Sequence, residues 1–289
     1  MNPASKARIK FILSMVIFGT LALFTRHISV SSGELALYRA ILAAVLVGIY
    51  LPASGQKFSP INIRTALPLL LLSGAAMGVN WILLFQAYTY TSVSAATLSY
   101  YFAPVIVTIV SPLLFHEKLT KKQLICFIMS TIGLVLIIDI RNVSDGSSNL
   151  TGILFGLGAA GFYAAVIILN KFISAVSGLY RTLLQFIAAV IVLTPYVLCT
   201  GGFHLTSLDF SGWICLFIVG LIHTGITYCI YFSSLSELKG QEVSILSYID
   251  PLVAVLISVV FLKEPLSPSQ FIGGAMILGF TLWNERGSE

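Results

Sequence analysis

Two ionisable residues lie inside long apolar stretches of this sequence, where charged groups are costly and often functional. Asp250 stands roughly 12–14 Å of helix from the nearer end of its stretch, counting about 1.5 Å per residue. Its short side chain cannot reach the membrane surface from there. We consider two interpretations: a structural carboxylate that is permanently paired or protonated, and a coupling carboxylate that binds a proton or cation.

Arg39 lies about six residues, or roughly 9 Å, below the end of an earlier apolar stretch. Its long side chain could extend to the lipid headgroups. It could instead hold a substrate carboxylate through two parallel hydrogen bonds. Because Asp250 lies only about 7 Å deeper by the same measure, an Arg39–Asp250 pair is a third alternative. Glu34, near the entrance of the same stretch, is predicted to be solvated.

Polar and aromatic side chains gather at middle depth in both halves of the chain. Aromatic rings beside polar groups suit a small zwitterion or cation, because a ring can cover its apolar or cationic part. Packing and hydrogen bonding between helices is the alternative for each residue alone, and His223 could also relay protons. The predicted cavity residues are Asn80, Trp81, Tyr100, Tyr101, Tyr163, His223, Tyr228 and Tyr248.

A sequence pattern occurs twice, with Pro104 and Pro251 at the same place in each copy, 147 residues apart. A tyrosine precedes each proline by three residues, and Glu117 and Glu264 follow at the same distance. A proline inside a helix removes a hydrogen bond and kinks it, so this pair is a candidate hinge or gate, with simple packing as the alternative. The two glutamates are expected to be structural, each at the start of the following helix, where the dipole favours a carboxylate.

The elements that must position these residues are membrane-spanning helices. Of the 289 residues, 57% are hydrophobic and 9% charged, so lipid must be the solvent for most of the chain. A spanning helix needs about 20 mostly apolar residues. Ten segments meet this requirement: 9–28, 33–52, 66–88, 92–114, 121–140, 151–172, 177–198, 211–233, 242–262 and 268–284.

The distribution of lysine and arginine predicts the orientation. Basic residues gather in alternate connections and at both ends of the chain, which puts both termini in the cytoplasm. Five crossings per half then place the two copies of the repeat in opposite orientations. We predict an all-α integral membrane protein of ten helices, with inverted five-helix repeats at residues 1–142 and 143–289. The net charge of +5 serves orientation and does not indicate nucleic-acid binding.

The chain resembles the drug/metabolite transporter superfamily, in particular its EamA-like ten-helix branch. Two departures from the common pattern are His116, where a glycine often precedes the glutamate, and Asp250, where an uncharged residue is common. The residues that carry the resemblance are Phe18-Gly19-Thr20, Arg39, Ala87-Tyr88-Thr89-Tyr90-Thr91-Ser92, Ala103-Pro104, Glu117-Lys118-Leu119-Thr120, Asp250-Pro251 and Lys263-Glu264-Pro265-Leu266-Ser267. The resemblance implies export of amino acids, other metabolites or drugs, whereas some relatives import quaternary amines.

We therefore expect a multi-pass transporter of the inner (plasma) membrane that exports small metabolites such as amino acids by alternating access. Arg39 would recognise a carboxylate, and Asp250 would couple transport to protons. The alternative is an importer of a cationic amine such as choline, with Tyr101, Tyr228 and Tyr248 as a cage around the amine. Without a GxxxxGK[ST] motif or a catalytic motif, neither direct use of ATP nor enzymatic activity is expected. No cofactor, metal or nucleic-acid partner is expected, and the chain is expected to act as a monomer.

Overall fold

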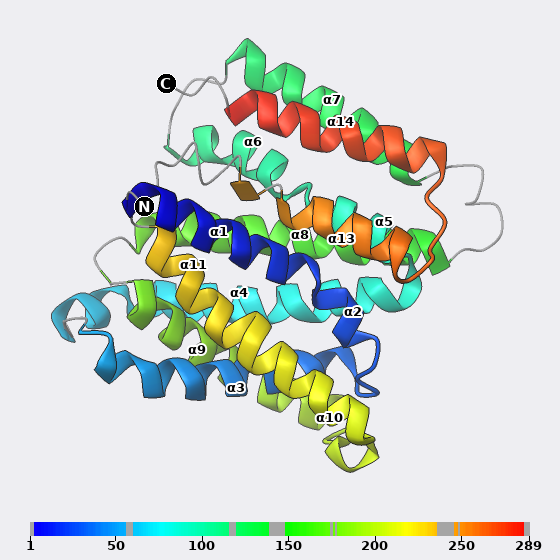
Figure 1. The fold of residues 1–289 in the computed structure, drawn as a ribbon. Coiled ribbons are helices and arrows are strands. Elements are labelled where there is room, and N and C mark those ends of the chain that lie inside the picture. Colours follow the sequence, from blue (N-terminus) through cyan, green and yellow to red (C-terminus); the bar gives the residue numbers. More distant parts are fainter. Residues whose placement is uncertain are drawn as a thin grey trace.

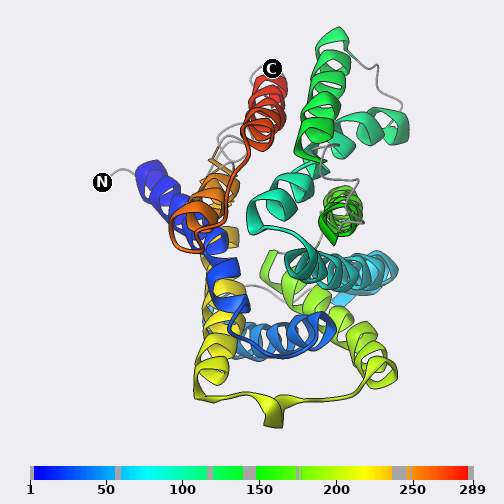
Figure 2. The same ribbon diagram turned by 90° about the vertical axis from the view of Figure 1, so that its right-hand side faces the viewer.

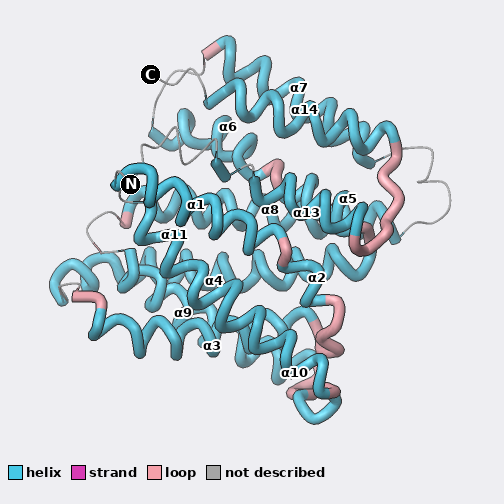
Figure 3. Tube along the Cα trace, viewed as in Figure 1, coloured by secondary structure: helices cyan, strands magenta, loops and turns pink. Residues whose placement is uncertain are grey.

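A computed structural model describes residues 3–55, 60–115, 120–138, 148–173, 176, 178–235, 246–247 and 249–285. No strand occurs in these ranges, where helices are joined by short connections (Figures 1 and 3). The helices are α1 (Pro3–Gly19), α2 (Leu21–Thr25), α3 (Ser32–Ala53), α4 (Pro60–Tyr90), α5 (Val93–Tyr100), α6 (Ala103–Phe115), α7 (Lys121–Ile138), α8 (Ser148–Phe172), α9 (Gly178–Thr200), η2 (Leu205–Ser207), α10 (Phe210–Phe217), η3 (Ile218–Ile226), α11 (Thr227–Leu235), α13 (Ile249–Val260) and α14 (Pro268–Glu285).

Within the described ranges, six helical stretches are long and apolar enough to cross a membrane: Ser5–Thr25, Ser32–Ala53, Ile63–Tyr90, Asn149–Asn170, Gly178–Thr200 and Phe210–Tyr231. Each overlaps one of the ten predicted segments. Shorter apolar helices occupy parts of three more, at Val93–Val107, Leu124–Leu136 and Ile249–Val260. The remaining predicted segment, 268–284, coincides with α14. Hydrophobic length thus predicts where the helices lie, because apolar side chains must face lipid or each other over the whole span.

The predicted fourth segment is divided in two. Helix α5 ends at Tyr100, α6 begins at Ala103, and Pro104 is the second residue of α6. Pro104 therefore lies in the first turn of a helix, where a missing N–H is tolerated, and not at the mid-helix position that the sequence suggested. Pro251 is the third residue of α13 as described, but residues 246 and 247 before it are also helical, and residue 248 lies outside the described ranges. The mid-helix position of Pro251 stays a prediction.

Contacts between helices repeat from one half of the chain to the other. Helix α4 packs on α8 and α9, and correspondingly α11 packs on α1 while η3 packs on α3. Helix α6 contacts α8, and α13 contacts α1 in the same way. Corresponding helices also pair directly: α3 packs on α9, and α7 packs on α14, the latter pair lying side by side in Figures 1 and 2. The beginning of α1 and the end of α14 lie at the same end of the molecule (Figure 1).

Candidate substrate site

Arg39 is buried in the largest apolar cluster, where only 3% of it is exposed. Its guanidinium lies over the indole ring of Trp81, with Cζ 4.3 Å from the ring centroid, and 5.3 Å from the centroid of Phe85. Its Nε donates a hydrogen bond to Thr224 Oγ1 at 3.0 Å. A charge held against aromatic faces inside the protein is not extended to the headgroups, so the snorkelling interpretation is wrong.

The Arg39 guanidinium has no acidic partner among the described residues. In particular, it forms no ion pair with Asp250, and its Nε bond to Thr224 is the one hydrogen bond it makes with a described residue. A buried charge without a counter-charge is strongly unfavourable unless something else supplies the opposite charge. The terminal nitrogens of Arg39 are therefore suited to an anionic group that comes from outside the protein.

Asp250, in the first turn of α13, is the second charged group of the site. Its carboxylate accepts a hydrogen bond from the Tyr101 hydroxyl. It is also near enough to interact electrostatically with the hydroxyls of Tyr88, Tyr100 and Tyr228. The same three tyrosines interact with Arg39. Arg39 and Asp250 thus both lie near the same three tyrosines without forming an ion pair with each other.

The aromatic residues of the site form two contiguous groups. In one, the ring of Tyr100 stacks on that of Tyr163 at 5.2 Å and meets that of Tyr101 edge-on at 5.7 Å. In the other, Tyr228 contacts Phe18 and Phe186 at 5.3 and 5.4 Å. Rings of this kind can cover the apolar part of a ligand held between the two charges.

Two predicted cavity residues have bonding partners within the protein. Asn80 Nδ2 donates to the carbonyl of Ala159 at 2.6 Å and so joins α4 to α8. His223, which is 2% exposed, has Nε2 3.0 Å from Thr20 Oγ1 and Nδ1 3.3 Å from the carbonyl of Ile218. The contacts of Asn80 with Ala159 and of His223 with Thr20 link separate helical segments, the alternative considered for each residue. Tyr248 and the side chain of Pro104 lie outside the described residues.

Residues 6–139 and 150–284 each match the sequence model of the EamA-like transporter family. The chain belongs to this family. Like its relatives, it is placed in the drug/metabolite transporter superfamily, as the resemblance implied. This EamA-like transporter is a multi-pass membrane protein, in agreement with its apolar helices.

Curated relatives of this EamA-like transporter carry transporter names in several organisms. The uncharacterized transporter YxxF of Bacillus subtilis is 34% identical over 266 residues, which cover 89% of this chain and 82% of that protein. An uncharacterized transporter of Archaeoglobus fulgidus is 28% identical over 95% of both chains. Protein PecM of Dickeya dadantii is 27% identical over 83% of this chain and 80% of its own. A solved crystal structure at 15% identity shares the fold, with a TM-score of 0.66 over 96% of both chains.

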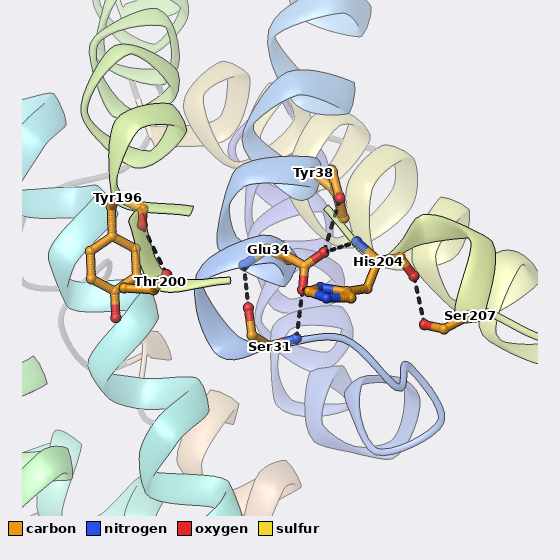
Figure 4. A network of polar contacts seen from close by, with 7 residues as sticks. All are labelled: Ser31, Glu34, Tyr38, Tyr196, Thr200, His204 and Ser207. Carbon is orange, nitrogen blue, oxygen red and sulfur yellow. Dashed lines mark hydrogen bonds and ion pairs between the residues drawn. The ribbon is translucent and has the colours of Figure 1, made fainter. Parts of the chain in front are cut away.

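Glu34 of the transporter is buried, with 1% exposure, and the prediction that it is solvated is wrong. Its carboxylate accepts hydrogen bonds from Ser31 N at 3.2 Å, Tyr38 Oη at 3.2 Å and His204 N at 2.6 Å (Figure 4). His204 Nδ1 lies a further 3.2 Å from Oε2. The carboxylate is buried because donors from its own helix cap and from the connection between α9 and α10 satisfy it.

Glu264 is also structural, but it does not begin α14 as predicted. Its carboxylate accepts from the backbone N–H of Val93 at 2.8 Å, in the first turn of α5, and pairs with Arg26 and Ser258. The start of α14 is capped instead by Ser267 and Gln270. The side-chain oxygen of each residue accepts a hydrogen bond from the backbone N–H of the other. Glu264 and Arg26 line a pocket of about 720 Å³ between the end of α4 and the connection from α13 to α14. Glu117 lies outside the described residues.

Five residues of this site were not among the predicted site residues: Phe18, Phe85, Tyr88, Phe186 and Thr224. Phe85 and Tyr88 follow Trp81 at intervals of four and three residues, so they share its face of α4, and that spacing could have identified them. Thr224 carries no such signal, because its position depends on the local winding of η3. No group of three or more His, Cys, Asp or Glu residues within the described ranges could hold a metal ion.

Proposed function

We propose that this protein is a secondary active transporter that exports small zwitterionic metabolites, amino acids above all, across the inner (plasma) membrane. The observation that carries the proposal is the buried Arg39, which has no acidic partner among the described residues and lies near the same tyrosines as Asp250. A substrate carboxylate would supply the anion that Arg39 lacks, and the substrate itself would undergo no chemical change.

Asp250 has two roles in the proposal. Its carboxylate attracts the ammonium group of a zwitterion, and it takes up a proton when the substrate leaves. A carboxylate that alternates between a cationic ligand and a proton couples the two movements. The hydroxyl of Tyr101 would keep Asp250 oriented in both states, since it already donates to that carboxylate.

Alternating access would come from two inverted five-helix halves, residues 1–142 and 143–289, with both termini cytoplasmic and a single chain as the working unit. The two matches to the family model and the repeated helix contacts support a repeat of this kind. Glu264 of the second half holds Arg26 and Val93 of the first, so this contact must break when that side opens. Pro104, in the first turn of α6, and Pro251, in α13, are the proposed hinges.

Import of a cationic amine such as choline is the second candidate. It is favoured by the placement of Asp250 beside Tyr101, with Tyr228 nearby, since a carboxylate and aromatic rings are the groups that bind quaternary amines. This candidate gives no role to Arg39, which has no acidic partner in the part of the chain that the structure describes.

The test is counterflow in liposomes with labelled amino acids and quaternary amines, with and without a pH gradient. Replacing Arg39 with Gln should reduce amino-acid exchange by at least about ten-fold, because a bidentate charged contact is lost. Arg39→Lys is the matched control that keeps the charge without the planar fork, and it should recover only part of the activity. Asp250→Asn should still exchange substrate but no longer concentrate it with the gradient.

The outcomes separate the candidates. Exchange of amines that survives Arg39→Gln would favour the cationic-amine importer. Unchanged concentration of substrate by Asp250→Asn would make Asp250 structural and remove proton coupling from the proposal. Loading liposomes of known orientation from each side then gives the direction of transport.

A further inference from the structure

We propose that Thr224 is a positioning residue for Arg39, whose hydroxyl, set by the π-helical winding of η3, directs the terminal nitrogens of the guanidinium towards a substrate carboxylate. This inference deepens the proposed function and rests on it. It concerns carboxylate selectivity and assigns Thr224 no contact with substrate.

The winding of η3 determines which atoms its side chains can reach. Thr182 and Thr194, in the α-helix α9, donate to carbonyls four residues earlier. In η3 and just after its end, the side chains instead bond to the carbonyl five residues earlier. The pairs are His223 with Ile218, Thr224 with Val219, and Thr227 with Ile222. The wider turn moves every side chain relative to an α-helix of the same sequence, and such segments recur at functional sites.

Two glycines bring η3 close to the Arg39 face of α3. A Cβ atom at Gly220 would lie 2.7 Å from the Cβ of Leu42, and one at Gly225 would lie 3.3 Å from the Cβ of Leu46. Leu42 and Leu46 follow Arg39 by three and seven residues, so all three share one face of α3. Because Leu42 meets Gly220 and Leu46 meets Gly225, α3 and η3 run in the same direction. Thr224, next to Gly225, therefore lies near Leu46 along the axis of α3. Since Nε of Arg39 bonds to Thr224, the Arg39 side chain extends along η3 in the direction of the C-terminal end of α3.

The Thr224 hydroxyl is able to accept from Arg39 because its own proton is already used. It donates to the carbonyl of Val219 at 2.8 Å, which leaves its lone pairs for Arg39 Nε at 3.0 Å. The ring of Trp81 lies against the guanidinium, with Cζ 4.3 Å from the ring centroid. Because Nε is already bonded to Thr224, the edge that carries the two terminal nitrogens is the one left for a carboxylate, which it can bind end-on.

The closing experiment compares three variants in liposomes: Thr224→Val, Thr224→Ser and Thr227→Val. Thr227 is the matched control, since it is equally buried and also donates five residues back, at 2.7 Å, without contacting Arg39. The probes are labelled L-amino acids and the amines that differ from them only in lacking the carboxylate. Transport is measured as KM and maximal rate for each.

We expect Thr224→Val to raise KM for the amino acids about ten-fold, the size of one hydrogen bond to a charged group, with little change for the amines. Thr224→Ser should remain within about three-fold of wild type, and Thr227→Val should resemble wild type. Equal effects of the two valine variants, or no effect of Thr224→Val, would overturn the role of Thr224. If the valine variants do not fold, Thr224→Ala and Thr227→Ala make the same comparison.

Failure of the proposed function would look different. Wild-type protein that carries amines but no amino acid would remove the carboxylate site itself, and the role of Thr224 with it. Wild-type protein that carries amino acids, with all Thr224 variants unchanged, would leave the proposed function in place and remove only the positioning role.

Discussion

The carboxylate of Glu34 is buried near the start of α3. It accepts hydrogen bonds from donors in two separate parts of the chain. Ser31 and Tyr38 belong to the cap and first turns of α3, whereas His204 follows the left-handed pair Gly201 and Gly202 after α9. Positive φ at this pair turns the chain so that the His204 backbone N–H points at Glu34. The carboxylate therefore fixes the connection between α9 and α10 to α3.

Replacing Glu34 with Gln should destabilise the protein more than the loss of one contact. The amide NH₂ group would face donors, so at least one buried donor would be left without an acceptor, at a cost of about 1–3 kcal/mol. We expect the apparent melting temperature in detergent to fall by roughly 5 °C. Tyr38→Phe is the control, since it removes one donor and leaves the carboxylate satisfied. Equal shifts for the two variants would contradict this account.

The burial of Glu34 and the partner of Arg39 could not be read from the sequence. Glu34 stands three residues after a serine at a helix start, the pattern of a capping box, which is normally exposed. What buries it is His204, 170 residues away in the chain. Asp250 and Arg39 could be identified, because ionisable groups inside apolar stretches are rare. Their separation could not, because it depends on the packing of α3, α4 and α13.

At the scale of helices, the length of the apolar segments predicted where most helices lie to within a few residues. It did not predict breaks or changes of winding inside a segment. The break between α5 and α6 and the π-helical winding of η3 both lie inside single predicted segments. Pro104 marks the first of these, but a π-helix leaves no periodic signal. Its winding is stabilised by contacts with α3, and such contacts are not local in sequence.

The approach of η3 to α3 gives a prediction at this scale. Gly220→Ala should destabilise the protein by about 1–3 kcal/mol, since the new methyl group has no room beside Leu42. Gly48→Ala, on α3 with nothing within 4 Å of the added Cβ, should be neutral or slightly stabilising. Combining Gly220→Ala with Leu42→Ala should recover part of the lost thermal stability. An additive loss in the double variant would show that the two residues do not oppose each other.

For the whole molecule, the contact of Glu264 with Arg26 joins one half of the chain to the other beside an open pocket. Val93 and Ser258 hold the same carboxylate, so four segments meet at one residue. In the proposed cycle this meeting point must separate each time the side near the pocket opens.

Linking the two positions should therefore stop transport. Cysteines in place of Arg26 and Glu264, in a chain whose four native cysteines are replaced, would be joined with a short reducible cross-linker. We expect exchange in liposomes to cease on linking and to return on reduction, while either single cysteine variant is unaffected by the reagent. Full exchange by the linked protein would mean that this contact does not move during the cycle.

Trp81 gives the site a further property. The centroid of its indole lies 4.3 Å from Cζ of Arg39, whose charge the substrate carboxylate would neutralise. The other two tryptophans belong to different surroundings, Trp213 stacked on Phe217 and Trp283 beside Lys122. The emission of an indole depends on the electric field across its ring. The fluorescence of Trp81 should therefore change when a substrate carboxylate binds Arg39. With Trp213 and Trp283 replaced by phenylalanine, substrate binding could be followed through the intrinsic fluorescence of the transporter.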